Sequence, residues 1–282
     1  MQVKDTTYWN YDRLYQLFKY SIYILILFNV IFFMIEDYSA SAITYKNGVS
    51  LANIGNAFSA SVDSIAWYIL LVVFELETYT LEDEQLSNRR KIILNTIAAI
   101  CYGFIVWAFL GYLEKAYMIY AFEPTSITDL CAIVGADISL ALELDNYVPL
   151  TQENCSTVTG QLYYQSNVMM YAGQTAFDDI SKIVLIDVVN AFTWLVVVVV
   201  LQIEVFLQLR GHLTSLMYKL NSVIKIIAYL ILFAACIYWG YMGDGIGFWD
   251  AILWLAAFIF IELNIFQWRQ EEEEEDSKAT VS

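Results

Sequence analysis

The sequence predicts an all-α integral membrane protein: a polytopic bundle of six transmembrane helices with one long extracytoplasmic loop. The chain of 282 residues is 59% hydrophobic and 16% aromatic and contains only two prolines. Its apolar residues gather in runs of about 20, the length that an α-helix needs to cross a hydrocarbon core of about 30 Å. Charged residues fall mainly between these runs. This alternation is typical of a chain whose apolar helix surfaces face lipid.

Six runs are predicted to span the membrane: Leu14–Ile35, Ile54–Leu76, Ile92–Leu113, Ile183–Leu207, Val223–Met242 and Ile246–Trp268. Residues 1–13, which precede them, are polar and aromatic and suit a membrane interface. The first run also has the charged start of a signal peptide, but we expect an uncleaved helix. The second run is the least hydrophobic, because it holds Asn56, Asp63 and several serines. Residues 14–268 thus form the predicted transmembrane domain.

The distribution of positive charge predicts the orientation. With a cytoplasmic N-terminus, only Lys46, Lys115 and Lys182 of the 14 Lys and Arg residues lie outside. Cytoplasmic segments of membrane proteins carry such an excess. We therefore expect a plasma membrane or bacterial inner membrane protein with both termini in the cytoplasm.

The predicted cytoplasmic tail, residues 269–282, contains the acidic run Glu271–Asp276. Like charges in such a run repel one another, so we expect a solvated, disordered tail. The net charge of −16 argues against a nucleic acid as partner, because binding to phosphates depends on Lys and Arg.

The long outer loop, residues 120–182, contains a mostly apolar stretch, Leu130–Leu144. This stretch is too short to span a bilayer, so we expect either a surface helix or a re-entrant segment. Two interpretations of the loop stay open. It forms a small packed cap over the bundle, or it dips into the mouth of a pathway with Asp137 near its tip.

Two of the four cysteines, Cys131 and Cys155, fall in the outer loop. In an oxidising compartment they would form a disulfide, whereas Cys101 and Cys236 lie inside spans and suit packing. Asn154 begins a glycosylation motif that matters only in a eukaryotic secretory setting. No His–Cys cluster, phosphate-binding loop or nucleophile motif is present in the sequence. We therefore expect no enzyme activity, no cofactor and no metal centre.

A polar pattern recurs in the second, fourth and sixth predicted spans. An acidic or amide residue is followed by tryptophan at +4 and by polar residues at +12 and +14. The copies are Asp63, Trp67, Glu75 and Glu77; Asn190, Trp194, Gln202 and Glu204; and Asp250, Trp254, Glu262 and Asn264. At about 100° per residue, +4 and +14 return to within about 40° of the start, whereas +12 lies about 120° away. The +12 residues therefore flank the face that the others share.

The recurrence predicts a helix hairpin repeated three times, with the long loop inserted in the middle copy. The middle copy departs from the others by carrying Asn190 and Gln202. The other spans of each pair begin near Lys19, Lys91 and Lys225.

A charge at the bilayer centre costs at least about 2.5 kcal/mol, so carboxylates within a span are not expected to face lipid. We expect Asp63, Asp187, Asp250 and Glu204 to point into the bundle. An outer polar ring around Asp63, Asn190 and Asp250 would be separated from an inner ring by a constriction. The inner ring would hold Glu75, Glu77, Glu204, Glu262 and Asn264, and the constriction Trp67, Trp194 and Trp254.

This arrangement favours a cation channel or a proton-coupled cation transporter that moves an inorganic cation or protons. A non-transporting membrane subunit or sensor stays open as an alternative. It would bind a protein partner through the outer loop or the acidic tail. In that case the Trp and Glu residues are interfacial anchors, and the Asp and Asn residues hold helices together. The sequence also leaves open whether one chain contains the path or a homo-oligomer surrounds it.

Overall fold

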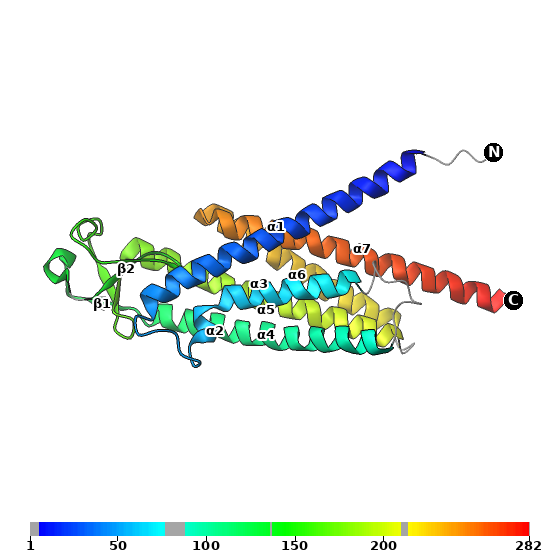
Figure 1. The fold of residues 1–282 in the computed structure, drawn as a ribbon, viewed down its shortest axis with the longest axis horizontal. Helices are drawn as coiled ribbons and strands as arrows, with labels where there is room; N and C mark the ends of the chain where they lie inside the picture. The colour runs from blue at the N-terminus through cyan, green and yellow to red at the C-terminus, as the bar shows by residue number, and fades with distance from the viewer. Residues whose placement is uncertain (1–5, 77–87, 136, 210–213, 282) are drawn as a thin grey trace.

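The chain folds into a bundle of long helices with a small β-sheet at one end (Figure 1). The computed structural model describes residues 6–76, 88–135, 137–209 and 214–281, with side chains for 13–76, 89–135, 137–204, 206–207 and 214–263. The helices are α1 (Thr6–Thr44), α2 (Ile54–Ala57), α3 (Ser59–Glu75), α4 (Asn88–Tyr120), α5 (Gln174–Leu209), α6 (Ser215–Met242) and α7 (Gly245–Val281). The strands are β1 (Glu123–Thr125), β2 (Ser139–Glu143), β3 (Asn146–Pro149), β4 (Leu162–Gln165) and β5 (Met170–Gly173).

Five of the described helices are long and apolar enough to cross a membrane. These candidate spans are Arg13–Thr44, Arg89–Tyr120, Gln174–Glu204, Ser215–Met242 and Gly245–Leu263. The run 54–76, the second of the six predicted spans, is interrupted at Phe58. The 17 residues of α3 fall short of the usual length of about 20 for a span. The structure thus supports a helical membrane protein, with five candidate spans in its described part where the sequence predicts six.

The helices close a ring. Along the chain α1 contacts α3, α3 contacts α4, α4 contacts α5, α5 contacts α6, α6 contacts α7, and α7 contacts α1. In Figure 1 the sheet lies at one end of the long axis, whereas the start of α1 and the end of α7 extend from the other. Helices α3, α5 and α7 consequently run away from the sheet. Equal sequence offsets in these three helices therefore correspond to similar depths in the bundle.

The sheet has five strands in the order β1-β4-β5-β2-β3, with β2 and β5 parallel and the other pairs antiparallel. Side chains alternate between its two faces. Ala141, Met170 and Ala172 pack on the ends of the helices. Leu140 and Tyr171 pack on the opposite face, in a small core that contains the disulfide. Because β5 continues directly into α5, the sheet is fixed to the bundle.

The sheet corrects the prediction of an all-α fold. Leu130–Leu144 forms neither a surface helix nor a re-entrant segment but a 3-10 turn, Leu130–Ile133, followed by β2. Asp137 does not enter a pathway: its side chain is 76% exposed and pairs with Lys46 at 2.9 Å. The predicted disulfide between Cys131 and Cys155 is present. It joins the turn to the segment between β3 and β4.

The acidic run near the C-terminus is helical, which corrects the prediction of a disordered tail. Helix α7 continues through Glu271–Asp276 to Val281. Glutamate has a high intrinsic helix propensity. Because the helix is already formed by its apolar half, extension through the acidic run needs no new nucleation.

Helices α2 and α4 approach closely at two glycines. A Cβ atom on Gly111 would overlap the carbonyl oxygen of Gly55, whereas a Cβ atom on Gly103, on the same helix, would meet nothing within 4 Å. We expect Gly111→Ala to destabilise the protein by about 1–3 kcal/mol, because backbone must move apart. Gly103→Ala, its control, should be neutral or stabilising, because alanine favours helix. Thermal unfolding in detergent measures both, and equal stabilities would contradict the close approach.

Candidate functional site

A cavity of about 670 Å³ lies inside the helix ring, beneath the sheet. Helices α1, α3, α4, α5, α6 and α7 all contribute to its wall, together with the turn between β2 and β3. Asp63, Asn190 and Asp250 line it, one from each of three helices, and Asp187 lines it one turn before Asn190. The structure thus brings the predicted outer polar residues to one cavity within one chain.

The cavity wall is strongly acidic. Its acidic residues are Glu36, Asp63, Glu143, Asp145, Asp179, Asp187, Asp244 and Asp250. Lys115 is the one basic side chain among the lining residues described. Such an excess of one sign in a low-dielectric cleft attracts ions of the opposite sign. Cations are therefore favoured in the cavity and anions are repelled.

Each of the three deepest aspartates accepts at least one hydrogen bond that fixes its orientation. Trp67 Nε1 donates to Asp63 at 3.1 Å. Trp239 Nε1 donates to Asp187 at 3.2 Å. Asn29 Nδ2, from α1, donates to Asp250 at 2.8 Å. These neutral donors orient the carboxylates but do not compensate their charges.

Aromatic rings close the deep end of the cavity. The ring centroid of Trp67 lies 6.0 Å from that of Trp194 and 6.4 Å from that of Trp254. Phe258 packs on both Trp194 and Trp67, with centroid distances of 4.4 and 5.8 Å. The tryptophans predicted as a constriction thus lie in contact at one level. They form the top of the main apolar core, which contains Leu71, Ile105, Val197, Leu201, Leu232 and Ala257.

A buried ion pair between α1 and α3 lies at the part of this core that is far from the cavity. Lys19 Nζ donates to Glu75 Oε1 at 2.6 Å, and their side chains are 0% and 8% exposed. The hydroxyl groups of Tyr20 and Tyr23 also donate to Glu75, at 3.0 and 3.3 Å. Glu75 follows Trp67 by eight residues, or about 12 Å along the helix. An apolar layer of this depth therefore separates the ion pair from the cavity.

A second cluster of the same composition joins α5, α6 and α7. Lys225 Nζ lies 3.0 Å from both Glu204 and Glu262, and the Tyr229 hydroxyl donates to Glu262 at 3.0 Å. As in the first cluster, a lysine and a tyrosine four residues later hold the +12 glutamate. The middle hairpin differs, because Gln202 donates to the Tyr102 hydroxyl at 2.7 Å. Repetition of the hairpin stays a prediction.

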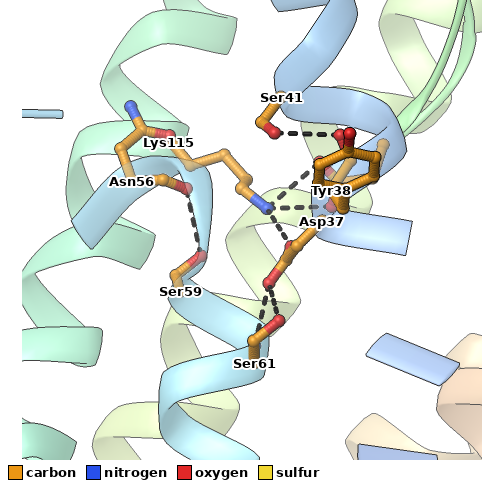
Figure 2. A network of polar contacts seen from close by, with 8 residues as sticks. Asp37, Tyr38, Ser41, Asn56, Ser59, Ser61 and Lys115 are labelled. Atoms are coloured by element: carbon orange, nitrogen blue, oxygen red, sulfur yellow. Dashed lines mark hydrogen bonds and ion pairs between the residues drawn. The ribbon is translucent and has the colours of Figure 1, made fainter. Parts of the chain in front are cut away.

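A third polar network supports the cavity wall near the sheet (Figure 2). Phe58, which precedes α3, offers no capping side chain. Instead, Asp37 of α1 accepts hydrogen bonds from the backbone N–H and the hydroxyl of Ser61, at 2.8 and 2.7 Å. Lys115 lies 3.9 Å from Asp37. It also lies 2.9 Å from Asp145 of the β2–β3 turn. An acceptor supplied by another helix thus satisfies the start of α3, two residues before Asp63.

Several groups outside the candidate spans have raised pKa values, among them Asp244 and Tyr147. Burial raises the pKa of Asp244, at the cavity rim, while hydrogen bonds from the backbone N–H groups of Gly247 and Ile246 oppose the shift. Burial and, next, the charge of Asp145 raise the pKa of Tyr147. Asp244 therefore keeps a proton to higher pH than an exposed aspartate does.

The predicted inner ring is not a ring of free acids. Glu75, Glu204 and Glu262 do not line the cavity and are paired with lysines. Lys19 and Lys225, which are predicted to lie near the starts of spans, are buried or half-buried within the bundle. Glu77 and the side chain of Asn264 lie outside the described part of the chain.

Several residues of the cavity were missed in the sequence. Trp239 and Asn29 each donate a hydrogen bond to one of the aspartates. Asn29 is a polar residue within the apolar run of the first predicted span, and this is a signal by which it could be found. Lys115 is predicted to lie outside the membrane, because the third predicted span ends at Leu113. Glu36 directly follows Ile35, the predicted end of the first span, so the sequence does not indicate that it faces a cavity.

The acidic residues are spread around the wall. Among the residues described, no three His, Cys, Asp or Glu side chains converge closely enough to hold one metal ion. Comparison of the chain with protein-family models, with curated proteins and with solved structures gives no match.

Proposed function

We propose that this protein is a proton-coupled cation transporter of a plasma membrane or bacterial inner membrane. The observation that carries the proposal is the convergence of Asp63, Asp187 and Asp250 on one cavity whose wall also includes the turn between β2 and β3. Carboxylates inside a membrane bundle are costly unless they face water or a cation. A cavity with this lining supplies such a place.

A transporter is favoured over an open channel because the cavity ends at Trp67, Trp194 and Trp254. The apolar core and two lysine–glutamate clusters follow beneath them. A closed layer beneath an accessible binding cavity suits a protein that exposes its site to one side at a time. Asp63, Asp187 and Asp250 would exchange protons for the cation, because either a bound proton or a bound cation relieves the repulsion between neighbouring carboxylates.

In this proposal the sheet lies on the outer side and both termini lie in the cytoplasm, as the distribution of Lys and Arg predicts. Helices α2 and α3 together form the sixth crossing. Their combined length, with the break at Phe58 stabilised by Asp37, is comparable to that of a span. Tags placed at either end, tested for accessibility in intact cells, check this topology.

Flux measurements in proteoliposomes test the transport function. We expect cation uptake driven by a pH gradient, and we expect Asp63→Asn and Asp250→Asn each to reduce the rate about tenfold or more, which corresponds to about 1.4 kcal/mol of lost interaction. Asparagine is nearly isosteric with aspartate but carries no charge and binds no proton at neutral pH.

Asp178→Asn is the matched control, because Asp178 lies on α5 near the cavity mouth but does not line the cavity. It should transport like the wild type. If both cavity variants also behave like the wild type under cation and pH gradients, the proposal is wrong. Single-channel currents from the wild type would show that the protein is a channel and not a transporter.

A non-transporting subunit or sensor is the second candidate. It is favoured by the extension of α7 past the bundle (Figure 1), which offers an acidic helix to a protein partner. Copurification of such a partner at fixed stoichiometry, together with no flux of any cation, would support it.

A further inference from the structure

We propose that the cation taken up by the cavity is an organic ammonium ion of small-molecule size, recognised jointly by the aromatic floor and the separated aspartates. This inference rests on the proposed function and names the chemical class of its substrate. It departs from the inorganic ion that the sequence suggests.

The first observation is the size of the cavity. Its volume of about 670 Å³ lies within the range of about 300–1,000 Å³ found for pockets that enclose small organic ligands. A single dehydrated metal ion would leave most of this space to water. An organic cation with several carbon atoms would occupy it.

The second observation is the aromatic wall. The lining includes Phe33, Trp67, Tyr112, Trp194, Trp239, Trp254 and Phe258. An ammonium group is attracted to the face of an aromatic ring, most strongly to tryptophan. Metal ions such as Mg²⁺ and Ca²⁺ prefer several oxygen ligands converging on one point, whereas this floor presents ring faces and separated carboxylates. The composition of the deep end thus favours ammonium over metal.

The third observation is the placement of the acceptors. The carboxylates do not converge on one point, as a metal site requires. Asp63 and Asp187 each use one oxygen to accept from an indole N–H, and their second oxygens have no partner among the described residues. The amide of Asn190 is likewise without a described partner. Separated acceptors of this kind suit a ligand whose donor groups are themselves separated.

Isothermal titration calorimetry of the purified, detergent-solubilised protein tests the inference. The titrants are tetramethylammonium, choline, putrescine and spermidine on one side, and Na⁺, K⁺ and Mg²⁺ on the other, at constant ionic strength. We expect saturable binding of at least one organic ion. Under the same conditions, the inorganic ions should bind at least about tenfold more weakly, since they gain little from the rings.

Variants at Trp254 isolate the aromatic contribution. Trp254→Leu should weaken binding of the organic ion about tenfold, whereas Trp254→Phe, which keeps a ring face, should stay within about threefold of the wild type. Size-exclusion profiles confirm that each variant folds. If Trp254→Leu does not fold, the same comparison at Trp239, between Trp239→Leu and Trp239→Phe, decides.

The outcomes separate the inference from the proposed function. Tight binding of an inorganic ion without binding of any organic ion would overturn the inference, while flux of that ion would still support transport. Equal affinity of Trp254→Leu and the wild type would overturn it as well. Absence of flux for every cation, including an organic ion that binds, would instead contradict the proposed function alone.

Discussion

Replacing Lys19 with methionine is expected to destabilise the protein by about 3–5 kcal/mol, the usual consequence of removing one partner of a buried ion pair. Lys19 is fully buried and donates to Glu75 at 2.6 Å. Without it, the Glu75 carboxylate loses a cationic donor at 2.6 Å, whereas the hydroxyl groups of Tyr20 and Tyr23 that also donate to it are neutral. Equilibrium unfolding by SDS in mixed micelles measures the change.

A second substitution shows whether the loss comes from the charge of Glu75. Glu75→Gln added to Lys19→Met removes the charge, so the double variant should be more stable than Lys19→Met alone. Lys182→Met is the control, because Lys182 and Asp179 are 54% and 45% exposed and lie 3.3 Å apart. Exposed pairs contribute about 1 kcal/mol or less. Equal losses at Lys19 and Lys182 would contradict the burial of the first pair.

Lys115→Met is expected to cost a similar amount, about 3–5 kcal/mol, and to loosen two parts of the fold together. The ammonium group of Lys115 lies between Asp37 and Asp145, and its side chain is 6% exposed. Its removal leaves two carboxylates close together without a cation. Because Asp37 also binds the start of α3 at Ser61, hydrogen exchange should rise in the first turn of α3 and in the β2–β3 turn.

Asp37→Asn should partly restore the stability of Lys115→Met. The amide oxygen still accepts from Ser61, and one of the two negative charges is gone. Lys46→Met is the matched control on the sheet side, because Lys46 pairs with the largely exposed Asp137. If Lys115→Met leaves hydrogen exchange in α3 unchanged, Lys115 does not support the start of that helix.

The spacing of Asp63, Asp250 and their tryptophans could be interpreted from the sequence because it depends only on helical geometry. When helices run in the same direction, residues at the same number of positions after the leading polar residue lie at similar depth and on similar faces. The apolar length of the spans likewise follows from the thickness of the bilayer.

The lysine–glutamate clusters could not be predicted, because the true helix lengths were not known. Helix α1 begins at Thr6 and α6 at Ser215. Lys19 and Lys225 therefore lie about 15 Å or more along their helices, rather than at their starts. Their partners come from other helices, and no local pattern records such a pairing.

The break before α3 and the sheet depend on tertiary contacts as well. Phe58 is not a residue that ends helices by itself, and the interruption is stabilised by Asp37 from α1. The strands are 3 to 5 residues long, which is too short for alternation to stand out in the sequence. The disulfide was predictable because two cysteines shared one loop.

The closed helix ring has a consequence for any assembly of this protein. Since the wall of the cavity is drawn from the helices of a single chain, each subunit of an oligomer would carry a complete compartment of its own. Association would then serve stability or control, and no binding position would have to be built where subunits meet.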